Sequence, residues 1–276
     1  MRVAAVILAR VGSTRLERKV LRDLGGMPLV AHTLRRAKSF PGVSDGGGVV
    51  LAIPVNRNDD ELVPVGEKYG ATVFRGDEDD VLLRLIMAAE TVEAEIVYRI
   101  TADNPLVDRG VVSGTWDAFS SGDVAHTARL VHRSLSEGGS DVCAFGWDYA
   151  VMEETPLGTT AEVVTMDALR RASEIADIPR LREHPTLAMY ENSELFRMLL
   201  VPSPEKWRHP EWRFTVDNEA DFRVVKTIME ELGVDATLDT IVPFLLEHPE
   251  IAAINSSVAQ KGWEELKGRK DAIGHV

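Results

Sequence analysis

Residues 3–9, VAAVILA, decide the fold class, because they form a continuous apolar run with no polar alternation. Such a run is typical of a central strand in a parallel sheet that helices cover on both faces. A helical pattern follows at residues 28–40, and it begins with a proline, which favours the first turn of a helix. A long polar loop lies between them, so the chain is expected to begin as strand, loop and helix.

The same alternation continues to about residue 110. Further buried strands are predicted at 49–54 (VVLAIP), 71–76 (ATVFRG) and 96–100 (IVYRI), and Asn58 and Asp79 are expected to cap the helices between them. Strands that alternate with helices indicate a parallel sheet with right-handed crossovers. We therefore expect an α/β fold built on a mostly parallel central sheet.

The second half of the chain has a different pattern. Short strand-like pieces alternate with helical stretches, and we expect them to add mixed strands and a lobe to the same sheet. The strand-like pieces are 123–127, 140–147, 161–165, 195–201 and 212–216, and the helical stretches are 166–175, 181–191, 219–232 and 241–248. The segment after Ser257 is expected to be a solvated helix or tail. No linker divides the chain, so residues 1–276 are predicted to form one domain.

Composition excludes several classes of function. The chain has 276 residues, is 45% hydrophobic and 27% charged, and carries a net charge of −13, which is the balance of a globular protein. The negative charge argues against nucleic acid and membrane surfaces as partners, and no apolar stretch is long enough to span a bilayer. Cys143 stands alone, which excludes an internal disulfide and a thiolate metal cage. With no secretory cleavage pattern after the first strand, a cytoplasmic location is expected.

The loop at 9–20, ARVGSTRLERKV, is a basic island in this acidic chain. Residues 1–22 hold six basic side chains against Glu17, a local net charge of +5. The loop leaves the carboxyl end of the first strand, where open parallel sheets place their ligands. Its spacing matches neither a Walker A loop nor a GxGxxG turn. The groups suited to a polyphosphate are one glycine, two hydroxyls and three cations: Gly12, Ser13, Thr14, Arg10, Arg15 and Lys19. The alternative is an ordinary solvated loop.

Residues 101–108, TADNPLVD, follow the strand at 96–100 and open onto the same edge of the sheet. A carboxylate there, that of Asp103, is suited to Mg²⁺, which is held by one or two carboxylates together with phosphate oxygens. The alternative is an Asx turn before Pro105, with Asp108 as the cap of the next helix.

Residues 213–222, RFTVDNEADF, place Asp217 between an expected strand and an expected helix. This position makes Asp217 a further candidate for chemistry. The alternative is that Asp217 or Asn218 serves only as the N-cap of that helix.

Together these segments resemble one family. The stretches ARVGSTRL with Lys19 and Val20, GMPLVAHTLRR, RGDEDDVLLR, YRITADNPLVD, REHPT and FTVDNEADF are similar to the cytidylyltransferase superfamily. The resemblance is closest to the spore coat polysaccharide biosynthesis protein F group, whose relatives are the CMP-3-deoxy-manno-octulosonate and CMP-sialic acid synthetases. It implies a glycosyltransferase A-like (nucleotide-diphospho-sugar transferase) α/β/α sandwich and a homodimer formed through a lobe around 123–164. The implied reaction joins CMP, from CTP, to a small anionic acceptor such as a sugar acid, a sugar or a phosphonate, with release of pyrophosphate.

The resemblance also implies roles for single residues. Catalysis is assigned to Arg15, Lys19, Asp103 and Asp217, with Asp103 and Asp217 holding Mg²⁺. Nucleotide binding is assigned to Ala9, Arg10, Gly12, Ser13, Arg15, Lys19, Arg75, Asp80, Thr101 and Ala102. Acceptor binding is assigned to Glu162, Arg182, Glu183 and His184, and for His184 the alternative is a capping or packed histidine in a helix.

Two positions depart from the family pattern. Glu17 and Arg18 stand where the family usually has Pro-Gly, and Thr160 replaces the aspartate of the PxGxDxE stretch, which suggests a different acceptor or a lost second-metal contact. Two other functions therefore stay open. One is a glycosyltransferase of the same fold that uses Asp77 and Asp79 as a DxD metal motif, and the other is a nucleotide-binding homologue without catalysis.

Overall fold

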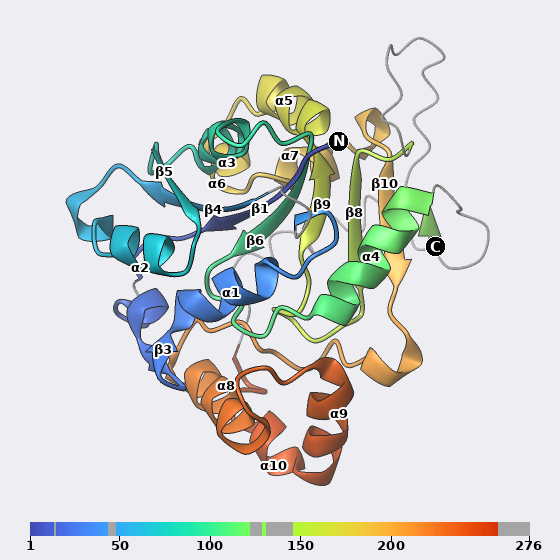
Figure 1. Cartoon of the computed structure of the whole chain (residues 1–276). Helices are drawn as coiled ribbons and strands as arrows, with labels where there is room; N and C mark the ends of the chain where they lie inside the picture. Colours follow the sequence, from blue (N-terminus) through green and yellow to red (C-terminus); the bar gives the residue numbers. More distant parts are fainter. Residues whose placement is uncertain (14, 44–47, 122–128, 131–145, 259–276) are drawn as a thin grey trace.

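The computed structural model describes residues 1–13, 15–43, 48–121, 129–130 and 146–258, and these residues form one central sheet with helices on both faces (Figure 1). The eight strands of the sheet lie in the order β5-β4-β1-β6-β9-β8-β10-β7. Their bounds are β5 Thr72–Gly76, β4 Val49–Pro54, β1 Val3–Leu8, β6 Ile96–Thr101, β9 Glu162–Thr165, β8 Tyr149–Glu153, β10 Met198–Pro202 and β7 Arg129–Leu130. A small hairpin, β2 (Asp23–Leu24) with β3 (Met27–Pro28), follows the first loop.

The first half of the sheet is parallel, as predicted. Strands β5, β4, β1 and β6 pair in parallel, and Leu8 of β1 lies opposite Thr101 of β6. Strand β9 is antiparallel to both β6 and β8, whereas β10 pairs in parallel with β8. The α/β prediction is confirmed, and the register brings the ends of β1 and β6 to the same edge of the sheet.

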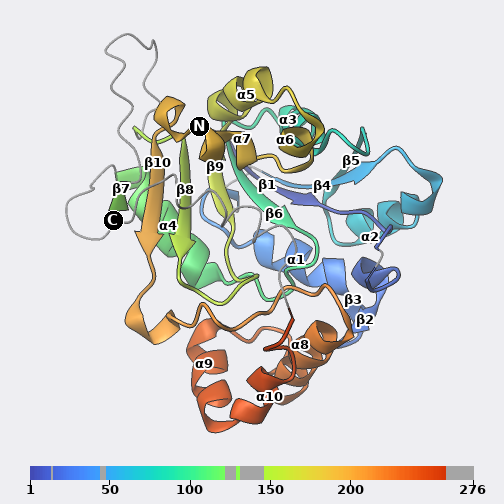
Figure 2. The same ribbon diagram turned by 180° about the vertical axis from the view of Figure 1, so that it is seen from behind.

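Two helical layers explain why β1 is apolar throughout. Ala5 and Ile7 of β1 pack into the hydrophobic cluster on one face of the sheet, and Ala4 and Val6 pack into the cluster on the other face. One layer contains α1 Leu29–Ala37, α2 Leu62–Lys68 and α4 Arg109–Ser121, and α8 Glu219–Leu232, α9 Leu238–Glu247 and α10 Pro249–Ala253 pack into the same hydrophobic cluster. The other contains α3 Val81–Glu90, α5 Met166–Ile175, α6 Pro179–Glu183 and α7 Leu187–Glu191. Both views show α8, α9 and α10 grouped beyond one end of the sheet (Figure 1, Figure 2).

Several local predictions need correction. Asn58 does not cap α2, because the side chain of Asn56 caps a short 3-10 turn, η3 (Arg57–Asp59), that precedes this helix. Asp80, one residue later than predicted, caps α3 by accepting a hydrogen bond from the amide of Leu83. The stretch at 181–191 forms two short helices, α6 and α7, instead of one.

The stretch at 212–216 is not a strand, and only an isolated bridge joins Arg213 to Leu157. Of the expected lobe, 122–128 and 131–145 lie outside the described residues, as does the segment from 259 onward, while β8 and β9 belong to the central sheet. A single domain therefore stays a prediction. None of the helices that the structure describes is long and apolar enough to cross a membrane.

Candidate functional site

Lys19 lies between two aspartates at the edge of the sheet where β1 and β6 end. Its Nζ atom is 2.7 Å from Oδ2 of Asp103 and 2.9 Å from Oδ1 of Asp217. A guanidinium nitrogen of Arg15 is 2.9 Å from the same Oδ1 atom. The Lys19 side chain is 13% exposed, so the contacts are partly shielded from water. The structure thus brings together all four residues predicted to be catalytic, although they are far apart in the sequence.

The loop that carries Lys19 turns sharply at Arg18. Lys19 begins a 3-10 turn, η1 (Lys19–Leu21), and Arg18 before it has a φ of 52°, in the left-handed region. Glycine adopts this region easily and other residues do not. Because Arg18 stands where the family usually has glycine, this departure from the pattern does not abolish the turn.

Two hydrogen bonds hold Asp103 itself, and a third holds the residue before it. The hydroxyl of Thr101 donates to its Oδ1 atom at 2.5 Å, and the amide of Val216 donates to its backbone carbonyl at 2.8 Å. The amide of Ala102 donates to the carbonyl of Leu8 in β1 at 2.9 Å. Thr101 and Ala102, both predicted near the nucleotide, therefore tie Asp103 to the sheet.

Asp217 is oriented by a buried network that the sequence did not reveal. Arg213 donates to Oδ2 of Asp217 at 2.5 Å and, through Nε, to Oδ1 of Asp221 at 2.8 Å. Asn255 donates to the same Oδ1 atom of Asp221 and to the carbonyl of Arg213, both at 2.9 Å. Arg213, Asp221 and Asn255 are 6%, 0% and 4% exposed. Asn218, and not Asp217, caps α8, so the Asp217 carboxylate is available to the site.

The charges of this cluster stabilise one another. Burial alone would raise the pKa of Asp217, but Lys19, Arg15 and Arg213 together lower it. Burial alone would lower the pKa of Lys19, but Asp103 and Asp217 together raise it. Both groups therefore remain ionised around neutral pH, which is the state that phosphate chemistry requires.

Asp59 is another residue that the sequence did not reveal. Its Oδ1 atom accepts a hydrogen bond from the amide of Val11 at 2.6 Å, and the residue is 2% exposed. This bond fixes the backbone just before Gly12 and Ser13. Among the described residues, and apart from the neighbours of Gly12 in the chain, no atom lies within 4 Å of a Cβ atom added at Gly12, so that side of the loop is open toward the described part of the protein. Thr14 lies outside the described residues.

Other predicted nucleotide ligands also have local partners. Arg75 contacts Asp60 at 2.5 Å and donates to the carbonyl of Asn56 at 2.9 Å. Asp80 caps α3 and lies 3.3 Å from a nitrogen of Arg182. Ala9 continues β1 by donating its amide to Ala52, and Arg10 follows it as an exposed residue. The assignment of these residues to the nucleotide stays a prediction.

The predicted acceptor residues separate into two groups. Glu162 faces Arg99 across the strand pair, at 3.2 Å from Oε2 to Nη1, and accepts further bonds from Tyr149 and Thr186. Arg182 instead bonds to Ser173 and Ala176 at the end of α5.

The last two acceptor candidates lie at the end of α6. Glu183 is exposed, and His184 follows as the C-cap residue, as the capping alternative expects. Asp108 likewise caps α4, as its alternative expects, by accepting bonds from the amides of Gly110 and Val111. Asp108 therefore has a capping role, whereas the assignment of Glu183 and His184 to the acceptor stays a prediction.

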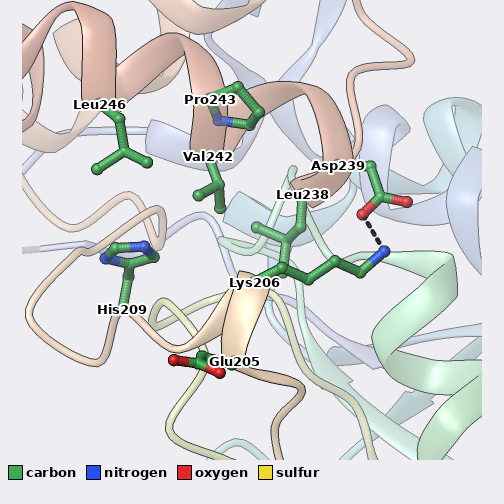
Figure 3. A pocket seen from close by; sticks show the side chains of 8 residues that line it. All are labelled: Glu205, Lys206, His209, Leu238, Asp239, Val242, Pro243 and Leu246. Carbon is green, nitrogen blue, oxygen red and sulfur yellow. Dashed lines mark hydrogen bonds and ion pairs between the residues drawn. The ribbon is translucent and has the colours of Figure 1, made fainter.

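A groove of about 590 Å³ lies elsewhere, between α9 and the 3-10 turn η5 (Glu205–Trp207) (Figure 3). Leu238 and Val242 of α9 line it, and an ion pair of 2.7 Å joins Lys206 to Asp239 at its edge. None of the predicted site residues lines this groove. The charged cluster around Lys19 is therefore the stronger candidate for chemistry.

The sequence of this chain is similar to known proteins over most of its length. Residues 4–240 match the family model described as cytidylyltransferase. The chain is similar to the spore coat polysaccharide biosynthesis protein SpsF of Bacillus subtilis, with 30% identity over 253 residues, 90% of this chain and 95% of that protein. It is 25% identical over 248 residues to 3-deoxy-manno-octulosonate cytidylyltransferase of Trichlorobacter lovleyi, covering 87% of this chain and 96% of the relative.

A solved structure shows the same fold. A cytidylyltransferase from Leptospira borgpetersenii superposes with a TM-score of 0.77 at 24% identity, over 94% of this chain and 100% of that one. The family model covers most of the sequence, including Lys19, Asp103 and Asp217, which the structure brings together. The chain belongs to the cytidylyltransferase family.

Proposed function

We propose that this protein transfers the cytidylyl group of CTP to a small anionic acceptor and releases pyrophosphate. The observation that carries the proposal is the position of Lys19 between Asp103 and Asp217, with Arg15 beside them. Cations on a glycine-containing loop at the end of a parallel strand suit a triphosphate. The family supports cytidine as the base, and the sugar-acid relative supports an acidic acceptor.

The chemistry follows from this arrangement. The oxygen of an acceptor hydroxyl attacks the α-phosphorus of CTP, the new O–P bond forms, the bond to the bridging oxygen of the pyrophosphate breaks, and the hydroxyl proton passes to solvent. Catalysis of such transfers depends mainly on positioning and on neutralising charge. Lys19 and Arg15 stabilise the negative charge of the departing pyrophosphate, while the network through Arg213 keeps Asp217 in place.

The two aspartates fit a magnesium ion. One oxygen of each carboxylate contacts the same cation, the ammonium group of Lys19, at 2.7 and 2.9 Å. The two carboxylates are therefore close enough to bind a metal cation together. In the described part of the chain, no group of three or more histidine, cysteine, aspartate or glutamate side chains could hold a metal. Two protein carboxylates plus phosphate oxygens match how Mg²⁺ is usually bound. When bound, Mg²⁺ would supply further positive charge for the phosphates.

The glycosyltransferase alternative gains no support from the DxD segment. Oδ1 of Asp77 accepts hydrogen bonds from the amides of Asp79 and Asp80, both at 2.8 Å, which is an Asx turn before α3. Asp80 then caps that helix. These carboxylates therefore have a local structural role. The homodimer and the cytoplasmic location stay predictions, and light scattering of the purified protein would measure the first.

Nucleotide binding can be tested without knowing the acceptor. Thermal unfolding is measured with CTP, UTP, GTP and ATP, each with and without Mg²⁺. A ligand at about 100 times its Kd adds about 2.7 kcal/mol of stability, which is a shift of several degrees for a domain of this size. We expect the largest shift with CTP and Mg²⁺.

The matched control compares two aspartates. Asp103→Asn should reduce the CTP shift. Asp235→Asn, which removes a 78% exposed carboxylate that pairs with Arg35, should leave the shift unchanged. No shift with any nucleotide, or a larger shift with UTP, would contradict the proposal. CTP binding without pyrophosphate release on any acceptor would instead support the homologue without catalysis.

A further inference from the structure

A second charged pair joins two neighbouring strands, β6 and β9, near the charged cluster around Lys19. Arg99 of β6 and Glu162 of β9 are directly opposite in the antiparallel register, and their side chains meet at 3.2 Å. The side chains are 22% and 16% exposed. The pair is therefore largely shielded by protein, yet part of it remains accessible to a small molecule.

Glu162 is held firmly without Arg99. Tyr149 donates to its Oε1 atom at 3.0 Å, and the hydroxyl of Thr186 lies 3.2 Å from each carboxylate oxygen. The hydroxyls of Tyr149 and Tyr190 are 2.6 Å apart, so the chain of hydrogen bonds continues beyond the carboxylate. Burial raises the pKa of both tyrosines, which keeps their hydroxyls protonated as donors. Neutral hydroxyls thus satisfy both oxygens of Glu162.

Arg99 uses far less of its own capacity. Within the described residues its guanidinium makes one hydrogen bond, from Nη1 to Glu162, and its buried Nε atom has no partner. The guanidinium group has five N–H donors in a planar fork. By contrast, Arg213 binds Asp217 and Asp221, and Arg182 binds Ser173 and Ala176. Arg99 is therefore a cation with spare donors.

The position of Arg99 relates it to the reaction site. Side chains alternate along a strand, so Arg99 and Thr101 of β6 point to the same face of the sheet. Thr101 bonds to Asp103, which in turn contacts Lys19. Two residues along a strand span about 6.6 Å. A small acceptor can therefore contact Arg99 at one end and lie near Asp103 at the other.

We propose that Arg99 binds the anionic group of the acceptor, a carboxylate or a phosphonate, through its free guanidinium donors, and so determines specificity for acids. This inference rests on the proposed function, because it names the residue that selects the acceptor at that site. Arginine binds planar or tetrahedral oxyanions with paired hydrogen bonds, which a lysine cannot match. Glu162 is the positioning residue that keeps the guanidinium in place.

The test measures pyrophosphate release with CTP and Mg²⁺ over a panel of acceptors. The panel holds 3-deoxy-manno-octulosonate, N-acetylneuraminate and small hydroxyalkylphosphonates, each beside its methyl ester. The variants are Arg99→Gln, Arg99→Lys and the control Arg170→Gln, which removes an arginine that is 56% exposed and pairs with Glu90 on the surface. The acids and the phosphonates form separate arms, so their rates also distinguish the two kinds of anion.

We expect wild type to use an acid and to discriminate against its ester. Arg99→Gln should raise the KM for that acid by about 10- to 100-fold, the loss expected for a charge-assisted pair of hydrogen bonds, and leave the KM for CTP unchanged. Arg99→Lys should recover only part of the loss. The low rate with the ester should not change in Arg99→Gln, which a merely structural role would not predict.

A double variant distinguishes the loss of the acceptor contact from misfolding of the protein. Arg99→Gln/Glu162→Gln removes both charges together, so no unpaired buried charge is left, and it should show the same loss of preference for acids. Two results would overturn the inference and leave the proposed function standing: a KM for the acid within twofold of wild type in Arg99→Gln, or a preference of wild type for the methyl esters over the acids. No pyrophosphate release with any acceptor, or no unfolding shift with CTP, would instead overturn the proposed function itself.

Discussion

Lys19 supplies, in the protein without its substrates, the positive charge that two facing carboxylates need. Asp103 and Asp217 both contact its Nζ atom, and the surrounding protein leaves only 13% of the side chain exposed. Two carboxylates that both contact one ammonium group are close together, and such like charges repel strongly when water is excluded. Lys19 is therefore important for the geometry of the site as well as for the binding of phosphate.

Removing either member of this contact should impair the reaction. Lys19→Ala and Asp103→Asn are each expected to lower kcat/KM by roughly 10²- to 10³-fold, the range found when one preorganised charged group is lost. Initial rates of pyrophosphate release measure the effect, and circular dichroism confirms the fold. Lys226→Ala, which removes a lysine 51% exposed on α8, is the control. Turnover near the wild-type rate in either variant would refute the site assignment.

Asp59 offers a separate test of the loop. Asp59→Ala leaves the amide of Val11 without its acceptor, whereas Asp59→Asn keeps an oxygen that can accept the bond. An unsatisfied buried donor costs about 1 to 3 kcal/mol. We expect the alanine variant to raise the Kd for CTP by about tenfold and the asparagine variant to have a smaller effect, as measured by titration calorimetry. Equal effects of the two variants would contradict the role of the acceptor oxygen.

At the scale of elements, the sequence predicts a strand or helix correctly where its residue pattern fits only one kind of structure. The apolar run of β1 predicts a strand covered on both faces, and the described strand packs into both hydrophobic clusters. The stretch at 212–216 also has a strand-like composition, but its amides and carbonyls pair with Leu157 and Asp103 instead of a neighbouring strand. Tertiary contacts, which composition does not report, decide between these outcomes.

The turn before η1 gives a prediction about backbone conformation. Arg18 has a φ of 52°, which costs an ordinary residue about 1 kcal/mol and costs glycine nothing. Arg18→Gly is expected to change the free energy of unfolding by less than about 1 kcal/mol, because the relief of strain is offset by a more flexible unfolded chain. Arg18→Val should destabilise the protein, since a β-branched side chain tolerates this region poorly. Urea unfolding of both variants measures the difference, and an equally stable valine variant would contradict the observed turn.

At the scale of the whole molecule, the site joins parts of the chain that no local pattern connects. Lys19, Asp103 and Asp217 could be predicted because each lies in a short motif beside an expected strand. Arg99, Arg213 and Asn255 could not, because their contacts form only when distant segments fold together. The one available signal was the ion-pair spacing from Arg213 to Asp217.

The charge balance of the folded protein predicts its response to acid. The folded pKa of Asp217 lies below its unfolded value of about 3.9. Its stabilising contribution is therefore complete above about pH 5 and is lost as pH falls through the folded pKa. The folded pKa of Lys19 is raised, so its contribution is complete below its unfolded value of about 10.4 and is lost as pH rises through the folded pKa.

We therefore compare unfolding midpoints of wild type and Asp217→Asn from pH 2 to pH 9. The variant should unfold at a lower temperature by a constant difference between about pH 5 and pH 9, and this difference should shrink below about pH 4. Asp235→Asn, at an exposed carboxylate, should show a much smaller difference throughout. A difference that closes near pH 6, or one that stays constant down to pH 2, would contradict the charge assignment.

The bonds from Asn255 to Arg213 and Asp221 have a consequence for protein synthesis. A ribosome makes the chain from its N-terminus, and early segments can fold before later ones emerge. The loop with Lys19 and the strand before Asp103 are thus made long before the segment that fixes Asp217. A nascent chain can build its parallel sheet early, but the hydrogen-bond network that orients Asp217 is complete only once residue 255 has left the exit tunnel. Activity should therefore begin late in translation, as a single event rather than by degrees.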